Sequence, residues 1–373
     1  MKKILALTLA LTLLLCGCGG ANAAAPETTA AAPAVEQTQA PTTEPTTVPT
    51  TEPEVYRNPL NGEVLDAPFT DRIFANTVSN MQDNLPHVGV TQADILIETF
   101  VNKNNIIRCL ALFSNIEDVE AIGSTRSTRP IFNQIAQHYD LVLSHAGGSS
   151  QALDDAKSRG IDNFNIDSWE VSSQGTSYRD TEYNRTYENT LFGVGSGIKD
   201  YAEAQGVQMN LERDYGLEFT ENGTPADGET ADTISLVFTF EGAKKETVMT
   251  YDAEAGKYVF NQYGQVMKDQ ITDETEMFTN VIIMNTQIST TGIYHIADFN
   301  AGGTGYYANG GKIIPIAWTC DADTEPFRFF HEDGTPLEIG VGNSYIAIAP
   351  DGSPVTYTAA EPVAETTAAT TAE

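Results

Sequence analysis

Residues 93–113 read ADILIETFVNKNNIIRCLALF, and this stretch decides the fold of the first half of the chain. Two apolar, β-branched runs, 93–102 and 106–113, flank a polar Lys-Asn-Asn cluster. Such runs on either side of a short turn signal are typical of a β-hairpin. We therefore expect two neighbouring strands here.

The residues after this hairpin alternate between helical and strand patterns. Pro130 suits the first turn of a helix, and apolar residues then recur at helical spacing as far as Tyr139. Residues 141–144 form a short apolar run that predicts a buried strand. The loop 145–148, His-Ala-Gly-Gly, leads to Ser149, a residue type that caps helices.

The two halves of the chain have different patterns, which predicts two domains in an α+β fold. A helical stripe over 191–201 completes a mixed-sheet α/β domain at 55–225. Residues 233–240 alternate strictly, which is typical of a half-buried strand, and they begin a mainly β domain at 226–356. Further strands are expected at 247–251, 257–260, 281–284, 292–299, 312–319 and 345–348. The polar, Gly-rich stretch 221–232 is the expected boundary.

The N-terminus has the features of an export signal. Lys2 and Lys3 precede an apolar run of about a dozen residues, too short to span a bilayer. The run ends in Leu-Cys-Gly-Cys, which resembles the lipobox of bacterial lipoproteins. We therefore expect a signal peptide at 1–17 and lipidation at Cys18. A lipid anchor of this kind would hold the protein on the extracytoplasmic face of the cell membrane.

Both ends of the mature chain are low in sequence complexity. Residues 18–54 are almost wholly Ala, Thr, Pro and Glu after the first few positions, and 357–373 repeat that composition. Such segments bury too little apolar surface to offset the entropy of ordering, so we expect disordered tails. The tails hold only eight of the 51 acidic residues, so the acidity belongs to the core.

Composition excludes several classes of function. With 51 acidic and 20 basic residues the chain has a formal net charge of −31, which disfavours nucleic-acid partners and anionic lipid surfaces. Four cysteines in 373 residues are not a disulfide framework, and Cys109 and Cys320 are expected to be buried free thiols. The five histidines show no paired spacing, so no metal and no cofactor are expected.

The order of motifs resembles the YerB-like family of bacterial lipoproteins, whose two domains carry only domain-of-unknown-function labels. The stretches that carry the resemblance are 58–62 (NPLNG), 89–95 (GVTQADI), 107–113 (IRCLALF), 122–130 (IGSTRSTRP), 145–149 (HAGGS), 178–180 (YRD), 251–252, 278–283 (FTNVII), 303–305, and 311–312 with Trp318. They span essentially the whole folded core. The resemblance implies the two-domain layout and the lipoprotein character, and it supplies no activity.

Arginine is concentrated in one window of the first domain. Six of the ten arginines lie between 108 and 185, where Lys157 is the only lysine. The planar guanidinium binds carboxylate, sulfate and phosphate through two parallel hydrogen bonds. One interpretation is an anion site in which the 126–129 and 145–149 loops share a pocket; the other is a set of internal salt bridges to Glu98, Asp94, Asp140 and Asp180. The candidate ligand-binding residues are Arg126, Arg129, His145, Gly147, Gly148, Ser149, Arg108, Glu98 and Arg179.

Two classes of function remain open. The first is binding of an anionic envelope component or a protein partner, without catalysis. The second is an envelope-acting hydrolase or transferase that uses the Arg126, Arg129, His145 and Ser149 region, although no G-x-S-x-G elbow surrounds Ser149. An aromatic platform for sugars is a further possibility, and the candidates for it are Trp169, Trp318, Tyr306 and Tyr307.

Overall fold

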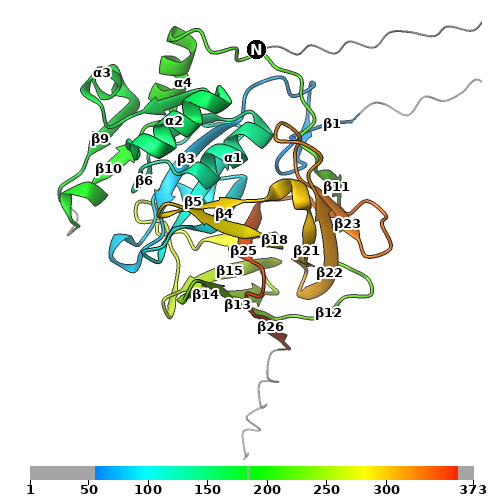
Figure 1. The fold of residues 1–373 in the computed structure, drawn as a ribbon. Coiled ribbons are helices and arrows are strands. Elements are labelled where there is room, and N and C mark those ends of the chain that lie inside the picture. The colour runs from blue at the N-terminus through cyan, green and yellow to red at the C-terminus, as the bar shows by residue number, and fades with distance from the viewer. Residues whose placement is uncertain (1–54, 183–184, 360–373) are drawn as a thin grey trace, which may run out of the picture. The chain divides into compact units, whose positions relative to one another are not determined.

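The hairpin predicted from residues 93–113 lies at the centre of the molecule (Figure 1). The computed structural model describes residues 55–182 and 185–359. In it, β4 (Ile95–Asn102) pairs antiparallel with β5 (Ile106–Phe113), with Leu96 opposite Ala111. Every residue of β4 is buried, as are all but the first of β5. Strands covered on both faces need apolar residues at nearly every position, which explains the continuous apolar runs.

A mixed sheet of 13 strands is built around this hairpin. β25 (Ser344–Pro350) runs parallel to β4 on one side, and β3 (Phe74–Ser79) runs antiparallel to β5 on the other. The order across the sheet is β12 (Glu229–Thr230), β22 (Lys312–Thr319), β21 (Gly303–Asn309), β18 (Asn280–Thr286), β25, β4, β5, β3, β7 (Val142–His145) and β8 (Asn163–Asn165), with β19 (Ile288–Thr291), β20 (Tyr294–Ala297) and β23 (Arg328–His331) attached beside it.

The α-helices that the structure describes lie within the first predicted domain, residues 55–225, which confirms its α/β character. They are α1 (Pro130–Tyr139), α2 (Ser150–Arg159), α3 (Trp169–Val171) and α4 (Gly195–Ala204). The helix expected from Leu191 begins later, so that part of the prediction was wrong. Leu191 belongs to β10 (Leu191–Gly193), which is buried between β6 (Ile122–Gly123) and β9 (Ser177–Arg179) in a small separate sheet.

A six-stranded sheet from the second half packs on one face of the large sheet. It comprises β16 (Gln265–Val266), β15 (Lys257–Gln262), β14 (Ala243–Asp252), β13 (Thr233–Phe240), β26 (Val355–Thr358) and β17 (Met277–Phe278). Phe238 and Phe260 of this sheet share a core with Phe100 of β4. On the other face, Ile131 and Ile135 of α1 pack in a second core. Figure 1 shows α1 and α2 above the large sheet and β13 to β15 below it.

Strands from both predicted domains share the large sheet, because β4 pairs with both β5 and β25. The described residues, 55–182 and 185–359, belong to one compact unit. The second half is mainly β, as predicted, and its β24 (Glu338–Gly340) forms a short two-stranded sheet with β11 (Glu218–Thr220). A further two-stranded sheet, β1 (Tyr56–Arg57) with β2 (Val64–Leu65), lies at the start of the described residues. β26 continues to Thr358, one residue past the expected start of the tail, because Tyr357 pairs with Ile234. The signal at 1–17, the tether at 18–54 and the tail from 360 lie outside the described residues.

Candidate functional site

Two loops at one end of the large sheet lie side by side. Residues 126–129 precede α1, and residues 145–149 join β7 to α2. The amide of Ala146 donates to the carbonyl of Arg126 at 2.9 Å, and the amide of Thr128 donates to the carbonyl of Gly147 at 3.0 Å. Both helices therefore begin at one joined pair of loops, where the first N–H groups of each helix lack partners within the helix.

The two loop glycines serve the geometry of this turn. Gly147 has φ of +66°, a left-handed conformation that favours glycine, and its amide donates to Oδ1 of Asn165 at 2.7 Å. A Cβ on Gly148 would lie 3.1 Å from the side chain of Leu153. Both residues thus bring the 145–149 loop close to its neighbours.

Arg108 is the most buried residue of the arginine cluster, which we define as Arg108, Arg126 and Arg129. Its side chain rises from β5 and donates to the carbonyl of Ser127, and only 3% of the residue is exposed. Among the described residues, no carboxylate lies within ion-pair distance of it. Burial, followed by the charges of Arg129 and Arg126, lowers the pKa of Arg108 well below its ordinary value.

Arg129 also has no carboxylate within ion-pair distance in the described part of the chain. Its guanidinium donates to the carbonyl of Thr128 at 2.6 Å and lies 5.3 Å from the centroid of the Tyr294 ring. Its Nε is buried and has no hydrogen-bond partner. Burial lowers the pKa of Arg129, and the charge of Arg126 adds to this effect. Two neighbouring guanidinium groups are thus held without a counter-charge.

Arg126 and Arg179 line a hollow of about 360 Å³ beside the cluster. Arg126 donates to the carbonyl of Glu188 at 2.6 Å and to Oδ1 of Asn189 at 2.8 Å. The Glu188 carboxylate lies 3.7 Å from Arg126 and is mostly exposed, so this ion pair is weak. The hollow is lined by Arg126, Ser127, Ala146, Asp167, Arg179, Tyr187 and Glu188.

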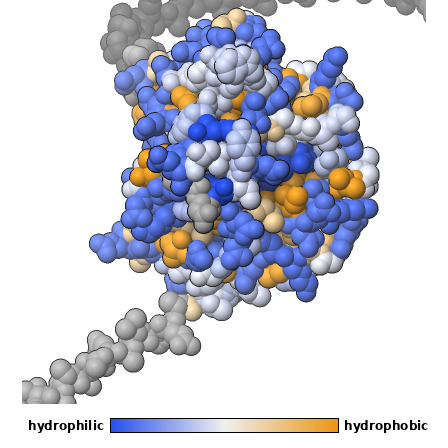
Figure 2. All heavy atoms as spheres, turned by 90° about the vertical axis from the view of Figure 1, so that its left-hand side faces the viewer, coloured by the Kyte–Doolittle hydropathy of each residue, from blue (hydrophilic) through white to orange (hydrophobic). Residues whose placement is uncertain are grey.

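A second hollow of about 370 Å³ adjoins the first and shares Asp167, Arg179 and Tyr187 with it. Its other lining residues are Trp169, Ser172, Ser173, Ser177, Tyr178 and Leu191. Arg179 donates to Oδ1 of Asp167 at 2.6 Å and to the carbonyl of Tyr187 at 2.6 Å. Figure 2 looks onto the side of the molecule that carries α3, β9 and β10, where hydrophilic side chains dominate and hydrophobic ones are scattered.

His145 and Ser149 are not arranged for catalysis. The Oγ of Ser149 accepts a hydrogen bond from the amide of Ala152 at 3.1 Å and so caps α2. The Nε2 of His145 lies 3.0 Å from Oδ1 of Asn163, and its Nδ1 is buried without a partner. Burial lowers the pKa of His145, which favours the neutral ring. The contacts of the described residues include none between His145 and Ser149, and neither lines the two hollows.

Glu98 lies away from the cluster, contrary to the expectation that placed it in the site. Glu98 and Arg108 are on neighbouring strands, but Arg108 is opposite Thr99, so the two side chains point to opposite faces of the sheet. Glu98 enters the core between the two sheets, where it pairs with Lys245 and accepts from Tyr345 at 2.5 Å. It therefore cannot bind a ligand of the arginine cluster.

The other expected salt-bridge partners are also used elsewhere. Asp94 accepts from Asn61 at 2.6 Å and from Ser114 at 2.8 Å, and Asp140 pairs with Arg72 at 3.2 Å. The arginine partners are instead Asp167 for Arg179 and Asp155 for Arg159. The expected set of internal salt bridges is therefore wrong for Arg108 and Arg129.

The remaining chemistry-bearing residues are mostly internal. Cys109 and Cys320 are buried free thiols, as predicted. Of the proposed sugar platform, Trp318 and Tyr307 are buried in a core, while Trp169 is exposed. No group of three or more His, Cys, Asp or Glu that could hold a metal ion occurs within 55–182 and 185–359.

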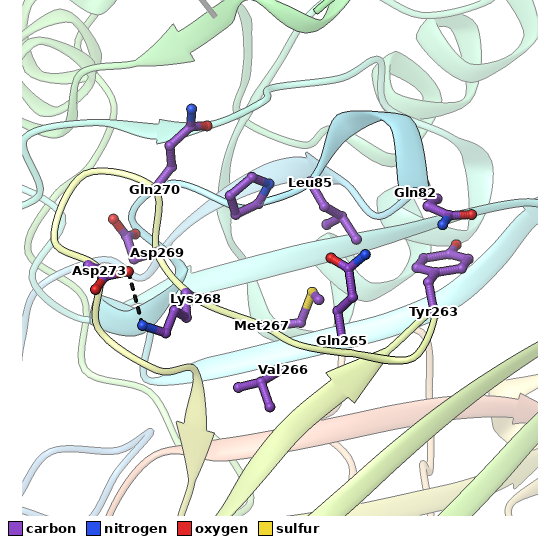
Figure 3. Close-up of a pocket in the computed structure, with 11 residues that line it drawn as sticks. Gln82, Leu85, Tyr263, Gln265, Val266, Met267, Lys268, Asp269, Gln270 and Asp273 are labelled. Atoms are coloured by element: carbon purple, nitrogen blue, oxygen red, sulfur yellow. Dashed lines mark hydrogen bonds and ion pairs between the residues drawn. The ribbon is translucent and has the colours of Figure 1, made fainter. Parts of the chain in front are cut away.

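A further hollow of about 300 Å³ lies between residues 82–86 and 263–273 (Figure 3). Figure 3 shows Lys268 paired with Asp273 on one side of it and Gln82 near Tyr263 on the other. The carboxylate of Asp269 accepts from the amides of Ile271 and Thr272. Its charged groups therefore already have partners, and the hollow offers no evident ligand site.

The sequence analysis missed Asp167, Tyr178 and Tyr187 at the two hollows. The available signal was the recurrence of tyrosine in the polar stretch 178–188, which lacks the apolar neighbours that a core position needs. Asp167 carried no signal of its own, because its pairing with Arg179 depends on the fold.

Comparison with known proteins bears on the whole chain. The family model described as "Protein of unknown function (DUF3048) N-terminal domain" matches residues 60–208, and the corresponding C-terminal domain matches 236–346. "Putative lipoprotein YerB" of Bacillus subtilis (strain 168) is 25% identical over 298 residues, which cover 79% of this chain and 86% of the relative. The crystal structure of YerB from Bacillus subtilis matches with a TM-score of 0.69 at 22% identity, over 80% of this chain and 99% of that one.

These matches confirm the predicted resemblance to the YerB-like family. They name a lipoprotein and supply no activity or ligand. Among the described residues, no helix is long and apolar enough to cross a membrane. Cys18 lies outside the described residues, so its lipidation remains a prediction.

Proposed function

Because the chain belongs to the DUF3048 family, and its Bacillus subtilis relative is named a lipoprotein, we propose that it is a lipid-anchored extracytoplasmic protein that binds an anionic component of the cell envelope. Cys18 would carry the lipid, and the arginine cluster would bind the anion. The proposal includes no catalytic step, because Ser149 caps a helix and His145 is bonded to Asn163.

The observation that carries the proposal is the unpaired charge of Arg108 and Arg129. Arg108 is buried and Arg129 is half-buried, and holding their guanidinium groups close together without a carboxylate is unfavourable, since each loses water and gains no counter-charge. A bound anion would supply that charge and accept hydrogen bonds from both groups. The N–H groups at the starts of α1 and α2 would add to the attraction.

The net charge of −31 does not prevent such binding. Charges beyond about 10 Å are largely screened at physiological ionic strength, whereas the arginines act at contact distance. A local positive focus on an acidic body also selects for anions compact enough to enter it.

The test compares Arg129→Gln, Arg129→Lys and the wild-type full chain, with binding of inorganic phosphate and of a glycerol-phosphate polymer measured by calorimetry. We expect Arg129→Gln to weaken binding roughly tenfold or more, equivalent to about 1.4 kcal/mol. Without ligand, its melting temperature should stay the same or rise, because an unpaired charge has been removed. Arg129→Lys, which keeps the charge but loses the planar fork, should fall between the two.

Arg328→Gln is the matched control, because Arg328 already pairs with Asp214 at 2.5 Å. It should leave anion binding unchanged. If no anionic probe binds the wild-type protein, or if Arg129→Gln sharply lowers the melting temperature without ligand, the cluster is structural and the proposal fails.

A further inference from the structure

Three aromatic side chains are exposed around the two adjoining hollows. Trp169, Tyr187 and Tyr178 are 84%, 67% and 42% exposed. They come from α3, from the turn at Tyr187–Asn189 and from β9. Large aromatic side chains bury apolar surface when they can, so a group of exposed rings around a hollow marks a binding surface.

Two of these rings, those of Tyr187 and Tyr178, are held in place by their neighbours. The guanidinium of Arg179 lies 4.1 Å from the centroid of the Tyr187 ring and also binds Asp167. The ring of Tyr178 packs against Phe192 at 5.7 Å. Groups fixed in this way lose little conformational entropy on binding, so the surface is preorganised for a ligand.

The size and lining of the hollows favour a small polar ligand over a protein. Volumes of about 360 and 370 Å³ fall in the range of small-molecule pockets. Ser172, Ser173 and Ser177 make much of the second hollow polar, whereas the centre of a protein interface is depleted of such groups.

A sugar ring has the chemistry that these residues would recognise. Its C–H face stacks on an aromatic ring, and its hydroxyls pair with planar groups such as the carboxylate of Asp167 and the guanidinium of Arg179. The first hollow also contains Arg126, which belongs to the arginine cluster. An acidic substituent would therefore fit at that end, with a neutral ring near Trp169.

We propose that the two hollows bind an acidic glycan, with sugar rings on Trp169 and Tyr187 and the acidic group at Arg126, the member of the arginine cluster that lines the first hollow. This inference rests on the proposed function and specifies the class of its ligand. The site recognises sugar rings and charge together, so neither feature alone gives full affinity.

The test uses the full chain and four probes: a chitooligosaccharide, a wall glycan strand of the same length that carries lactyl carboxylates, a glycerol-phosphate polymer, and inorganic phosphate. We expect the acidic glycan to bind most tightly. Trp169→Ala should weaken the acidic glycan roughly tenfold and leave phosphate binding unchanged. Arg126→Gln should weaken both, because Arg126 is the member of the arginine cluster that lines the first hollow.

Ile271→Ala is the control, since Ile271 is exposed but lies outside both hollows. It should leave all affinities unchanged, and circular dichroism should show that Trp169→Ala is folded. If phosphate binds through Arg129 but the glycan binds no better and Trp169→Ala has no effect, the glycan site is refuted while the anion site stands. If the neutral oligosaccharide binds as well as the acidic one, the acidic class is refuted. Failure of every probe refutes both proposals and leaves a protein partner as the alternative.

Discussion

Replacing Lys245 with Met should destabilise the fold by about 3–5 kcal/mol, because it leaves a buried carboxylate without its counter-charge. Glu98 is fully buried between the two sheets and pairs with Lys245 of β14. Its carboxylate also accepts from Asn80 at 2.5 Å, from Thr247 at 2.9 Å and from Tyr345 at 2.5 Å. These neutral donors would remain in the variant and would stabilise the carboxylate only in part.

The expected loss corresponds to a fall in melting temperature of roughly 5–8 °C, at about 1.6 °C per kcal/mol for an unfolding entropy of about 2.1 cal/mol/K per residue over the described residues. Denaturant unfolding followed by circular dichroism at pH 7 gives the free energy directly. Lys268→Met is the matched control, because Lys268 pairs with Asp273 at the surface. Its cost should stay within about 0.5 kcal/mol.

A second substitution makes the reasoning refutable. Adding Glu98→Gln to Lys245→Met removes the buried charge, so the double variant should be more stable than Lys245→Met alone. If the stability lost through Glu98→Gln simply adds to that lost through Lys245→Met, the ion pair does not hold the sheets together. The same conclusion follows if Lys245→Met costs as little stability as Lys268→Met.

Three further predictions concern single positions. Cys18→Ala should abolish incorporation of a clickable fatty acid, and undiminished label in that variant would place the lipid elsewhere. Burial lowers the pKa values of His145, His138 and His295, so the unfolded state binds more protons below about pH 6.5 and stability should fall as the pH drops from 7 to 5.5; His145→Asn should reduce the slope of this dependence in part, and an unchanged slope would contradict the role of His145. Gly147→Ala should cost about 1–2 kcal/mol of unfolding free energy through backbone strain alone, since its Cβ would meet nothing closer than Asn165 at 4.0 Å; a loss well above that range would indicate a clash instead.

Local patterns in the sequence were sufficient to predict most helices and strands, but not which distant strands pair with one another. The hairpin at 93–113, the helix from Pro130 and the cap at Ser149 each depend on neighbouring residues, and the structure contains all three. Leu191 was assigned to a helix because its apolar spacing fits one. It forms a strand because β6 and β9 lie on either side of it.

The candidate site shows the same division. The backbone bonds between the 126–129 and 145–149 loops join segments that the sequence analysis had placed together. The partner of Glu98 could not be predicted, because Lys245 lies 147 residues away in the sequence. The face of the sheet to which Glu98 points also depends on the register of β4. The exposure of the tryptophans could not be predicted either: of Trp169 and Trp318, only Trp169 is exposed to solvent.

The position of β4 between β5 and β25 also sets the order in which the chain can fold. β5 follows β4 after a short turn, so the hairpin can form as soon as both strands have been synthesised. The other edge of β4, where Leu96 is opposite Tyr345, stays unpaired until β25 has also been synthesised. Contacts of such sequence separation slow folding, and an unpaired apolar strand edge invites association with other chains in the meantime. A chain cut after the first half would keep that edge unpaired permanently, so we expect such a fragment to aggregate more readily than the complete chain.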